Sequence, residues 1–143
     1  MSLDQTESSR LARAQQLREQ GELARRRDAV TARKCYQAAV ALFREVGDPL
    51  TIAHAVRHLG DVYVEQDSRD LAEPCYLEAL QLYRDHCDTS SLNFANAIRS
   101  LAVLRSEQSA ALWQEALNLY KNLGIEPGVQ ESSSRLAALS NYK

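Results

Sequence analysis

Aromatic and small side chains recur along this chain in a fixed order. Three segments, 32–43, 72–83 and 109–120, each carry an aromatic residue, a small residue, a leucine and a second aromatic residue at spacings of three and four. This spacing places the four side chains on one face of an α-helix. The chain has only five glycines and three prolines, and no stretch shows the sustained alternation of polar and apolar residues that is typical of a strand. The sequence therefore predicts an all-α protein.

A second pattern precedes each of these segments. Residues 52–60 resemble residues 94–102, and residues 13–21 resemble both more weakly. Helix pairs that recur in this way form helical hairpins, in which these segments are the first helices and the aromatic segments are the second helices. The last two first helices are 42 residues apart and the last two second helices are 37 apart, so the turn inside the third hairpin is five residues shorter. That turn is predicted at residues 105–108.

Turn and capping residues divide the chain between these helices. Gly47-Asp48-Pro49 combines a helix stop, an N-cap and a proline suited to the first turn of a helix. Because proline is best tolerated in a first turn, Pro74 predicts a helix start near residues 68–70. Residues 132–139 repeat the first-helix pattern without a second helix, which predicts a cap on the last hairpin. We expect a flexible N-terminus at 1–8 and a single domain at 9–143, with repeats at about 9–47, 49–87 and 90–124 and a cap helix at about 127–141.

Two strings of residues resemble the signature of the tetratricopeptide repeat (TPR) family. They are Leu59-Gly60-x2-Tyr63 and Ala72-x3-Tyr76-x2-Ala79-Leu80. A repeat of about 40 residues is more similar to the longer repeats of kinesin light chains than to the standard TPR. The resemblance covers residues 10–141, with alanine at position 102 as one departure from the pattern. It implies a right-handed α-α superhelix of three TPR-like hairpins plus a C-terminal capping helix. It also implies a concave groove, lined by the first helices, that binds a protein or peptide.

An arginine recurs at one position of all three first helices. Arg18, Arg57 and Arg99 each lie three residues before the small packing residue of their helix. On stacked helices about 10 Å apart, these side chains form a ladder of guanidinium groups suited to the carboxylates of an acidic partner. A groove that favours acidic segments is therefore one hypothesis for these arginines.

Simple pairing of charges along each helix is the other interpretation of these arginines, and the sequence favours it. Glu22 follows Arg18 by four residues and Asp61 follows Arg57 by four, a spacing at which opposite charges neutralise one another on a solvated face. Arg99 has a valine at that spacing and is the least compensated of the three. The predicted groove residues are Arg18, Glu22, His54, Arg57, His58, Asp61, Asn96, Arg99, Ser100 and Val103.

Composition narrows the partner and the location. A net charge of −2 gives no broad basic surface for nucleic acid. No run approaches the roughly 18 apolar residues of a membrane span, and residues 1–10 lack the apolar segment of a signal peptide, so we expect no membrane partner and a cytoplasmic protein. Cys35, Cys75 and Cys87 form no C-x-x-C pair, and we expect them to be buried free thiols.

Only one constellation suggests chemistry of its own. His54, His58 and Asp61 lie within two turns of one helix and could share a metal ion, but the H-E-x-x-H arrangement is missing. We interpret the run 25–27 of three arginines as a solvated helix end and Trp113 as a core residue. The sequence predicts a non-enzymatic protein-binding adaptor without cofactor or metal, monomeric or weakly dimeric. A structural self-association module is the alternative, and a metal-binding or catalytic protein is the less favoured one.

Overall fold

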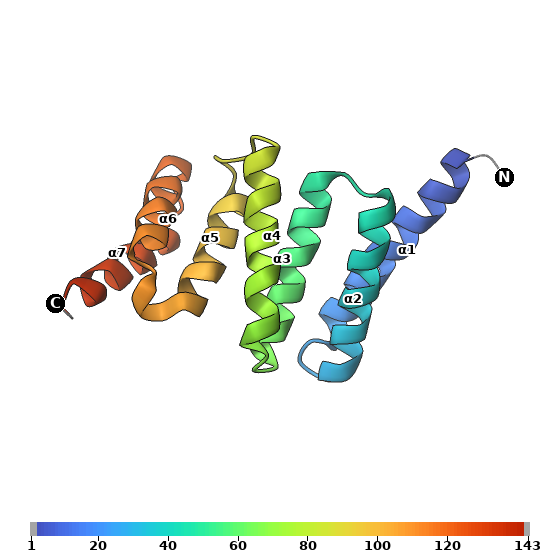
Figure 1. Cartoon of the computed structure of the whole chain (residues 1–143), viewed down its shortest axis with the longest axis horizontal. Helices are drawn as coiled ribbons and strands as arrows, with labels where there is room; N and C mark the ends of the chain where they lie inside the picture. The colour runs from blue at the N-terminus through green and yellow to red at the C-terminus, as the bar shows by residue number, and fades with distance from the viewer. Residues whose placement is uncertain (1–2, 142–143) are drawn as a thin grey trace. The chain divides into compact units, whose positions relative to one another are not determined.

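The computed structural model describes the backbone of residues 3–141 and the side chains from Thr6 onward. Within these residues the chain is helical, with no strand, which confirms the predicted fold class. Figure 1 shows the helices in chain order. They are α1 (Leu3–Ala24), α2 (Ala29–Val46), α3 (Pro49–Glu65), α4 (Arg69–Asp85), α5 (Leu92–Arg105), the short 3-10 helix η1 (Ser106–Gln108), α6 (Ala110–Leu123) and α7 (Glu126–Ser140).

The helix boundaries follow the predicted repeats closely. The helix pairs α1 and α2, α3 and α4, and α5 and α6 correspond to the three hairpins, and α7 corresponds to the cap. The short third turn is the 3-10 helix η1. Residues 3–8, expected to be flexible, belong to helix α1, while residues 1–2 lie outside the described part of the chain. The described helices include none that is both long enough and apolar enough to cross a membrane.

Side-chain caps fix where several helices begin. Asp28 and Asp48 accept hydrogen bonds from the backbone amides three residues later, at 3.0 and 2.9 Å, and Ser91 does the same for α5. Helix α6 ends at Gly124, whose φ of 71° is left-handed. Pro74 lies inside α4, five residues after its first residue Arg69, and thus one turn later than the sequence suggested. The helix start itself agrees with the prediction.

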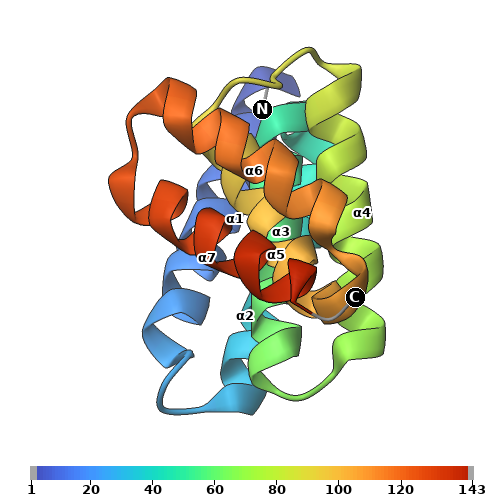
Figure 2. The ribbon, with the colours of Figure 1, turned by 90° about the vertical axis from the view of Figure 1, so that its left-hand side faces the viewer.

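The chain divides into two compact units, residues 1–82 and 83–143, where the sequence led us to expect one domain over 9–143. The first unit contains α1, α2, α3 and most of α4. The second contains the last residues of α4 together with α5, α6 and α7. Within the second unit, Figure 2 shows α7 next to α6.

Each hairpin of the first unit is closed by a glycine against a tyrosine ring. A Cβ atom at Gly21 would lie 2.7 Å from the ring of Tyr36, and a Cβ at Gly60 would lie 2.7 Å from the ring of Tyr76. Real side chains do not tolerate such distances, so only glycine permits this approach of the helices. The same helices then bury the periodic small and aromatic residues. In α2 these are Ala32, Tyr36, Ala39, Val40 and Phe43.

The second unit uses different residues for the same contacts. Trp113 replaces the tyrosine and is 1% exposed, which confirms its interpretation as a core residue. It packs in a hairpin whose first helix carries Ala102, which is fully buried, in place of glycine. Gly128 of α7 lies against the ring of Tyr120 in α6, so the cap helix repeats the close approach. Helix α7 thus covers the last hairpin, as the repeat pattern requires.

Ion pairs link neighbouring second helices in register. Arg44 of α2 binds both carboxylate oxygens of Glu78 in α4, within the first unit. At the equivalent position of the second unit, Arg84 lies 3.3 Å from Glu115 of α6. Exposed pairs of this kind contribute about 0–1 kcal/mol each, so they add little to the stability of the protein.

The cysteines are only partly as expected. All three are free, but Cys35 and Cys75 are half-buried and Cys87 is exposed, so the expectation of buried thiols is wrong for Cys87. Cys87 follows the end of α4 with a φ of 58°, at a chain reversal that leaves its side chain in solvent. Burial raises the pKa of the Cys75 thiol to about 11, so it stays protonated at neutral pH.

Ala39→Trp is expected to destabilise the protein by about 1–3 kcal/mol, because a large side chain has no room at a fully buried helix contact. Ala38→Trp is the matched control, since Ala38 is the preceding residue of the same helix and is exposed. It should change the free energy of unfolding by less than about 0.5 kcal/mol. Urea denaturation of both variants measures the difference. Equal effects at the two positions would contradict the assignment of Ala39 to the core.

Candidate binding face of the first helices

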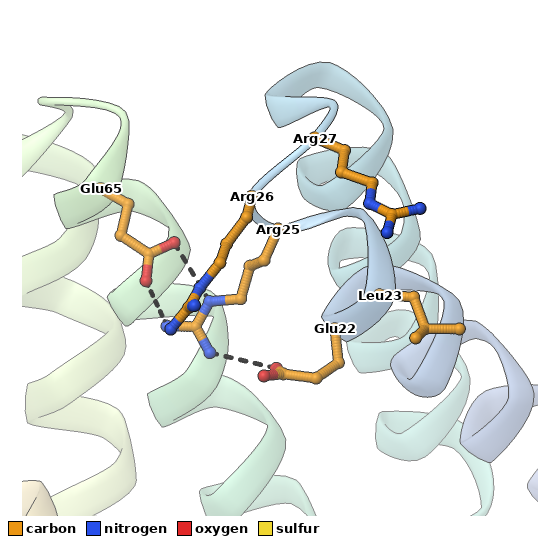
Figure 3. A pocket seen from close by; sticks show the side chains of 6 residues that line it. All are labelled: Glu22, Leu23, Arg25, Arg26, Arg27 and Glu65. Carbon is orange, nitrogen blue, oxygen red and sulfur yellow. Dashed lines mark hydrogen bonds and ion pairs between the residues drawn. The ribbon is translucent and has the colours of Figure 1, made fainter.

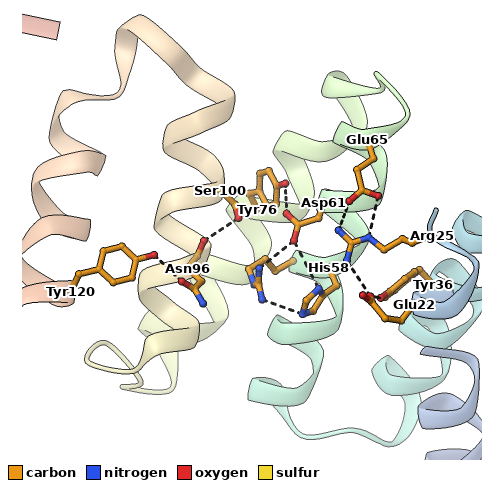
Figure 4. Close-up of polar contacts among 11 residues, drawn as sticks. Glu22, Arg25, Tyr36, His58, Asp61, Glu65, Tyr76, Asn96, Ser100 and Tyr120 are labelled. Atoms are coloured by element: carbon orange, nitrogen blue, oxygen red, sulfur yellow. Dashed lines mark hydrogen bonds and ion pairs between the residues drawn. The ribbon is translucent and has the colours of Figure 1, made fainter. Parts of the chain in front are cut away.

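Side chains of α1 and α3 meet on one face of the first unit (Figure 4). The link is Arg25, which follows α1 directly. Its Nη1 donates to Glu22 of α1 at 3.1 Å and its Nε donates to Glu65 of α3 at 3.1 Å. Only 18% of the Arg25 side chain is exposed. The two first helices are therefore joined by a charged network on this face.

Tyrosines of the second helices donate hydrogen bonds to the acidic residues of this face. Tyr36 of α2 donates its hydroxyl hydrogen to Glu22 at 2.5 Å, and Tyr76 of α4 donates to Asp61 at 2.6 Å. The Tyr36 hydrogen bond is the main cause that lowers the pKa of Glu22, although burial acts in the opposite direction. The tyrosines that close the hairpins thus also position the carboxylates that the sequence placed in the groove.

Arg57 is bound within its own helix. Its Nη1 donates to Asp61 at 3.2 Å and its Nη2 lies 3.1 Å from Nε2 of His58. The side chain is 11% exposed, and its Nε is buried without a hydrogen bond to any described group. For Arg57 the structure therefore shows the pairing with Asp61 that stood as the alternative to the ladder.

Two neutral histidines lie beside this arginine. The rings of His54 and His58 meet edge to face with their centroids 4.5 Å apart. Burial lowers the pKa of both, and the positive charge of Arg57 lowers it further, so that the pKa of His58 falls to about 3. The Nδ1 atom of each ring is buried without a described hydrogen-bond partner. No group of three His, Cys, Asp or Glu side chains in the described chain is arranged to hold a metal ion.

Arg18 differs from the other two arginines of the ladder. Its predicted partner Glu22 is taken by Arg25 and Tyr36. Among the described residues no ion pair includes Arg18, and its side chain is partly exposed on α1. Its positive charge is close enough to His54 to help lower the pKa of that ring, after burial and Arg57. Arg18 thus contributes a positive charge to the face formed with α3.

The second unit brings together the other predicted groove residues on α5. Tyr120 of α6 donates its hydroxyl hydrogen to the side chain of Asn96 at 2.7 Å. Ser100 donates to the Asn96 carbonyl oxygen at 3.0 Å, and Val103 is half-buried. Asn96 is therefore held from the second helix much as Glu22 and Asp61 are in the first unit.

The expectation that Arg99 is the least compensated arginine is wrong. It forms a two-pronged pair with Glu131 of α7, with Nη2 to Oε2 at 2.9 Å. This pair lowers the pKa of Glu131. Sequence reasoning examined only neighbours within the same helix, whereas Glu131 lies 32 residues further along the chain. Even so, 43% of the Arg99 side chain remains exposed.

Sequence reasoning also missed a pocket at the turn between α1 and α2. It measures about 790 Å³, and Figure 3 shows the side chains around it. They are Glu22, Leu23, Arg25, Arg26, Arg27 and Glu65. The arginine run pointed to this place, but the run alone suggested a solvated helix end. The position of Glu65 beside it depends on how α3 packs against α2.

Comparison with known proteins gives one family. The family model described as "SNAP: Soluble NSF attachment protein, SNAP" matches residues 2–138. This range includes the described helices α1 to α7 except the last residues of α7. A search of curated proteins found no match.

The free energy of unfolding is expected to fall as the pH is lowered from about 7.5 to about 5.5. In this range the unfolded chain protonates its histidines at their ordinary pKa of 6.5, whereas buried His58 stays neutral down to about 3. The unfolded state then binds the extra proton and is favoured at the lower pH. One such histidine contributes about 1.4 kcal/mol over this range.

Urea denaturation at the two pH values measures this loss. His58→Gln should flatten the dependence, because it removes the group that protonates only on unfolding. His86→Gln serves as the matched control, since His86 is exposed. If the His58 variant lost as much stability as the wild type on acidification, the buried neutral state of His58 would be refuted.

Proposed function

The chain belongs to the soluble NSF attachment protein (SNAP) family, which consists of TPR-like helical-repeat proteins with protein partners, and from this premise we propose that it is a non-enzymatic adaptor. It binds a segment of another protein on the face formed by its first helices. The family name describes an attachment protein, which supports a role in holding a partner. The free thiols support a location in a reducing compartment such as the cytoplasm.

The observation that carries this proposal is the polar face of the first unit. Its hydrogen-bonding groups come from the first helices, and tyrosines of the second helices fix two of them in place. A face whose side chains are already ordered loses little conformational entropy when a partner binds. In the first unit we assign this role to Arg18, Glu22, His54, Arg57, His58 and Asp61. In the second unit we assign it to Asn96, Arg99, Ser100 and Val103.

We include a preference for acidic segments in the proposal. Arg18 supports it, because its charge enters no ion pair among the described residues. Arg99 supports it less strongly, because Glu131 already holds its guanidinium in a bidentate pair, although 43% of its side chain is exposed. Arg57 plays a different part, because Asp61 holds it and only a small fraction of it is exposed. We also propose that the repeats are of the longer, kinesin-light-chain-like type. The 40-residue offset between Tyr36 and Tyr76 supports this.

Charge reversal on the first helices tests the binding face. A displayed library of random peptides is selected on the wild-type protein, and acidic peptides should be enriched. The double variant Arg18→Glu and Arg99→Glu should bind the selected peptides at least about tenfold more weakly, because each change replaces attraction by repulsion. Isothermal titration calorimetry measures the affinities.

The control carries the same change in charge on second helices. Lys34→Glu and Lys121→Glu alter exposed residues of α2 and α6, and the peptides should bind this protein as well as they bind the wild type. Circular dichroism confirms that both variants stay helical. Undiminished binding by the Arg18 and Arg99 variant, or selection of peptides without acidic residues, would remove the acidic preference.

If the face of the first helices is open to bind a partner, the protein should be a monomer in solution. Sedimentation velocity over a range of micromolar concentrations should show mainly the monomer, with at most a weak dimer at the highest concentration. A stable dimer would instead support the alternative of a self-association module. If Arg18→Glu and Arg99→Glu then dissociated that dimer, the first-helix face would be the contact between copies.

A further inference from the structure

A pocket, two arginines without described ion pairs and an exposed leucine lie together at the turn between α1 and α2. Arg26 and Arg27 are exposed on the turn, and no ion pair or hydrogen bond described in the chain occupies either side chain. Leu23 is 78% exposed, the largest exposed fraction among the large apolar residues of the described chain. All three line the pocket of about 790 Å³. Figure 3 shows Leu23 and Arg27 on the side of the turn away from Glu65.

The structure around this pocket is held in place before any ligand arrives. Arg25 binds Glu65 at the end of α3, and Gln66 donates to the Ala29 carbonyl oxygen at the start of α2, at 2.7 Å. These contacts tie both ends of the turn to α3. A turn fixed in this way presents Arg26 and Arg27 at constant positions, which favours binding because less order has to be created.

The charges of the pocket favour an anionic group of limited charge. Three arginines and two glutamates line the pocket, which gives it a net charge of +1. Glu22 and Glu65 are both bound by Arg25, so Arg26 and Arg27 are the lining charges without a described ion pair. Asp28, the next residue in the sequence, accepts hydrogen bonds from the backbone amide and hydroxyl of Thr31 as the N-cap of α2. Guanidinium groups bind carboxylates through paired hydrogen bonds. The two glutamates repel a dense polyanion such as nucleic acid.

We propose that this turn pocket binds an acidic peptide segment of a partner protein, in which carboxylates pair with Arg26 and Arg27 and a neighbouring apolar side chain covers Leu23. Leu23 supplies the apolar contact that an inorganic anion does not use. A membrane surface fits less well, because stable attachment to a bilayer needs more than one apolar side chain beside a few basic residues. The inference deepens the proposed function and rests on it, since it assumes a polypeptide partner.

A labelled short peptide with the repeated pattern Glu-Glu-Leu tests the pocket by fluorescence polarisation. The wild type should bind it, and Arg26→Ala with Arg27→Ala should weaken binding at least about tenfold. Leu23→Ala should weaken it about threefold or more, and the peptide with Gln in place of Glu should lose binding to the wild type. These residues are exposed, so thermal unfolding should be the same for all variants.

The matched control removes two positive charges elsewhere in the same unit. Arg33→Ala with Lys34→Ala, on α2, should leave the affinity for the peptide unchanged. Three results would each overturn the inference: no binding by the wild type, equal binding by the Arg26 and Arg27 variant, or equal weakening by the control.

Vesicles of phosphatidylcholine with phosphatidylserine, and inorganic phosphate, are tested as competing ligands. Neither the vesicles nor inorganic phosphate should displace the peptide. If vesicles bind through Leu23, Arg26 and Arg27 while the peptide does not, the turn is a membrane contact and the inference fails.

The first-helix variant Arg18→Glu with Arg99→Glu separates this inference from the proposed function. It should keep most of its affinity for the Glu-Glu-Leu peptide, because both residues lie outside the pocket lining. If library peptides depend on Arg18 and Arg99 while the Glu-Glu-Leu peptide fails to bind, only the pocket is refuted. If the Glu-Glu-Leu peptide binds as expected while the library peptides ignore Arg18 and Arg99, only the first-helix face is refuted.

Discussion

The structure of the first unit depends on the approach of a glycine to a tyrosine ring. Gly21 admits Tyr36, and Gly60 admits Tyr76, at distances that no side chain larger than hydrogen allows. The hydroxyl of each tyrosine then reaches the residue after the glycine, Glu22 or Asp61, and fixes its carboxylate. Packing between the helices of a hairpin and the order of the candidate binding face are therefore two consequences of one contact.

The second unit shows what happens when this contact changes. At the equivalent positions it has Trp113, which carries no hydroxyl, and Ala102, followed by Val103 in place of the acid. The tyrosine hydroxyl and the carboxylate are thus lost together, which leaves no buried carboxylate without a partner. Tyr120, about two turns further along α6, supplies a hydroxyl and holds Asn96 instead. The two units therefore present different chemistry on first helices that share one residue pattern.

Arginine has two roles in this chain, and they are separated by position. At several sites it joins helices: Arg25 links α1 to α3, Arg44 links α2 to α4, and Arg99 links α5 to α7. Elsewhere its charge enters no described ion pair, as at Arg18 and in the turn after Arg25. A guanidinium already held by a carboxylate offers a partner less free energy than one that is exposed and unpaired. The capacity of the protein to bind an acidic partner therefore depends on which arginines the fold leaves without an ion pair.

Local pattern in the sequence determined the helices, their hairpin pairing, the short third turn and the core positions such as Ala39 and Trp113, because helical periodicity and capping act over a few residues. The sequence also brought His54, Arg57, His58 and Asp61 onto one helix. Only the tertiary structure decided what these groups do, because burial and partners come from distant parts of the chain. Glu131 reaches Arg99 from 32 residues away, and Glu65 reaches Arg25 from 40 residues away. The division into two units and the pocket at the first turn likewise arise from packing between helices, which no local spacing specifies.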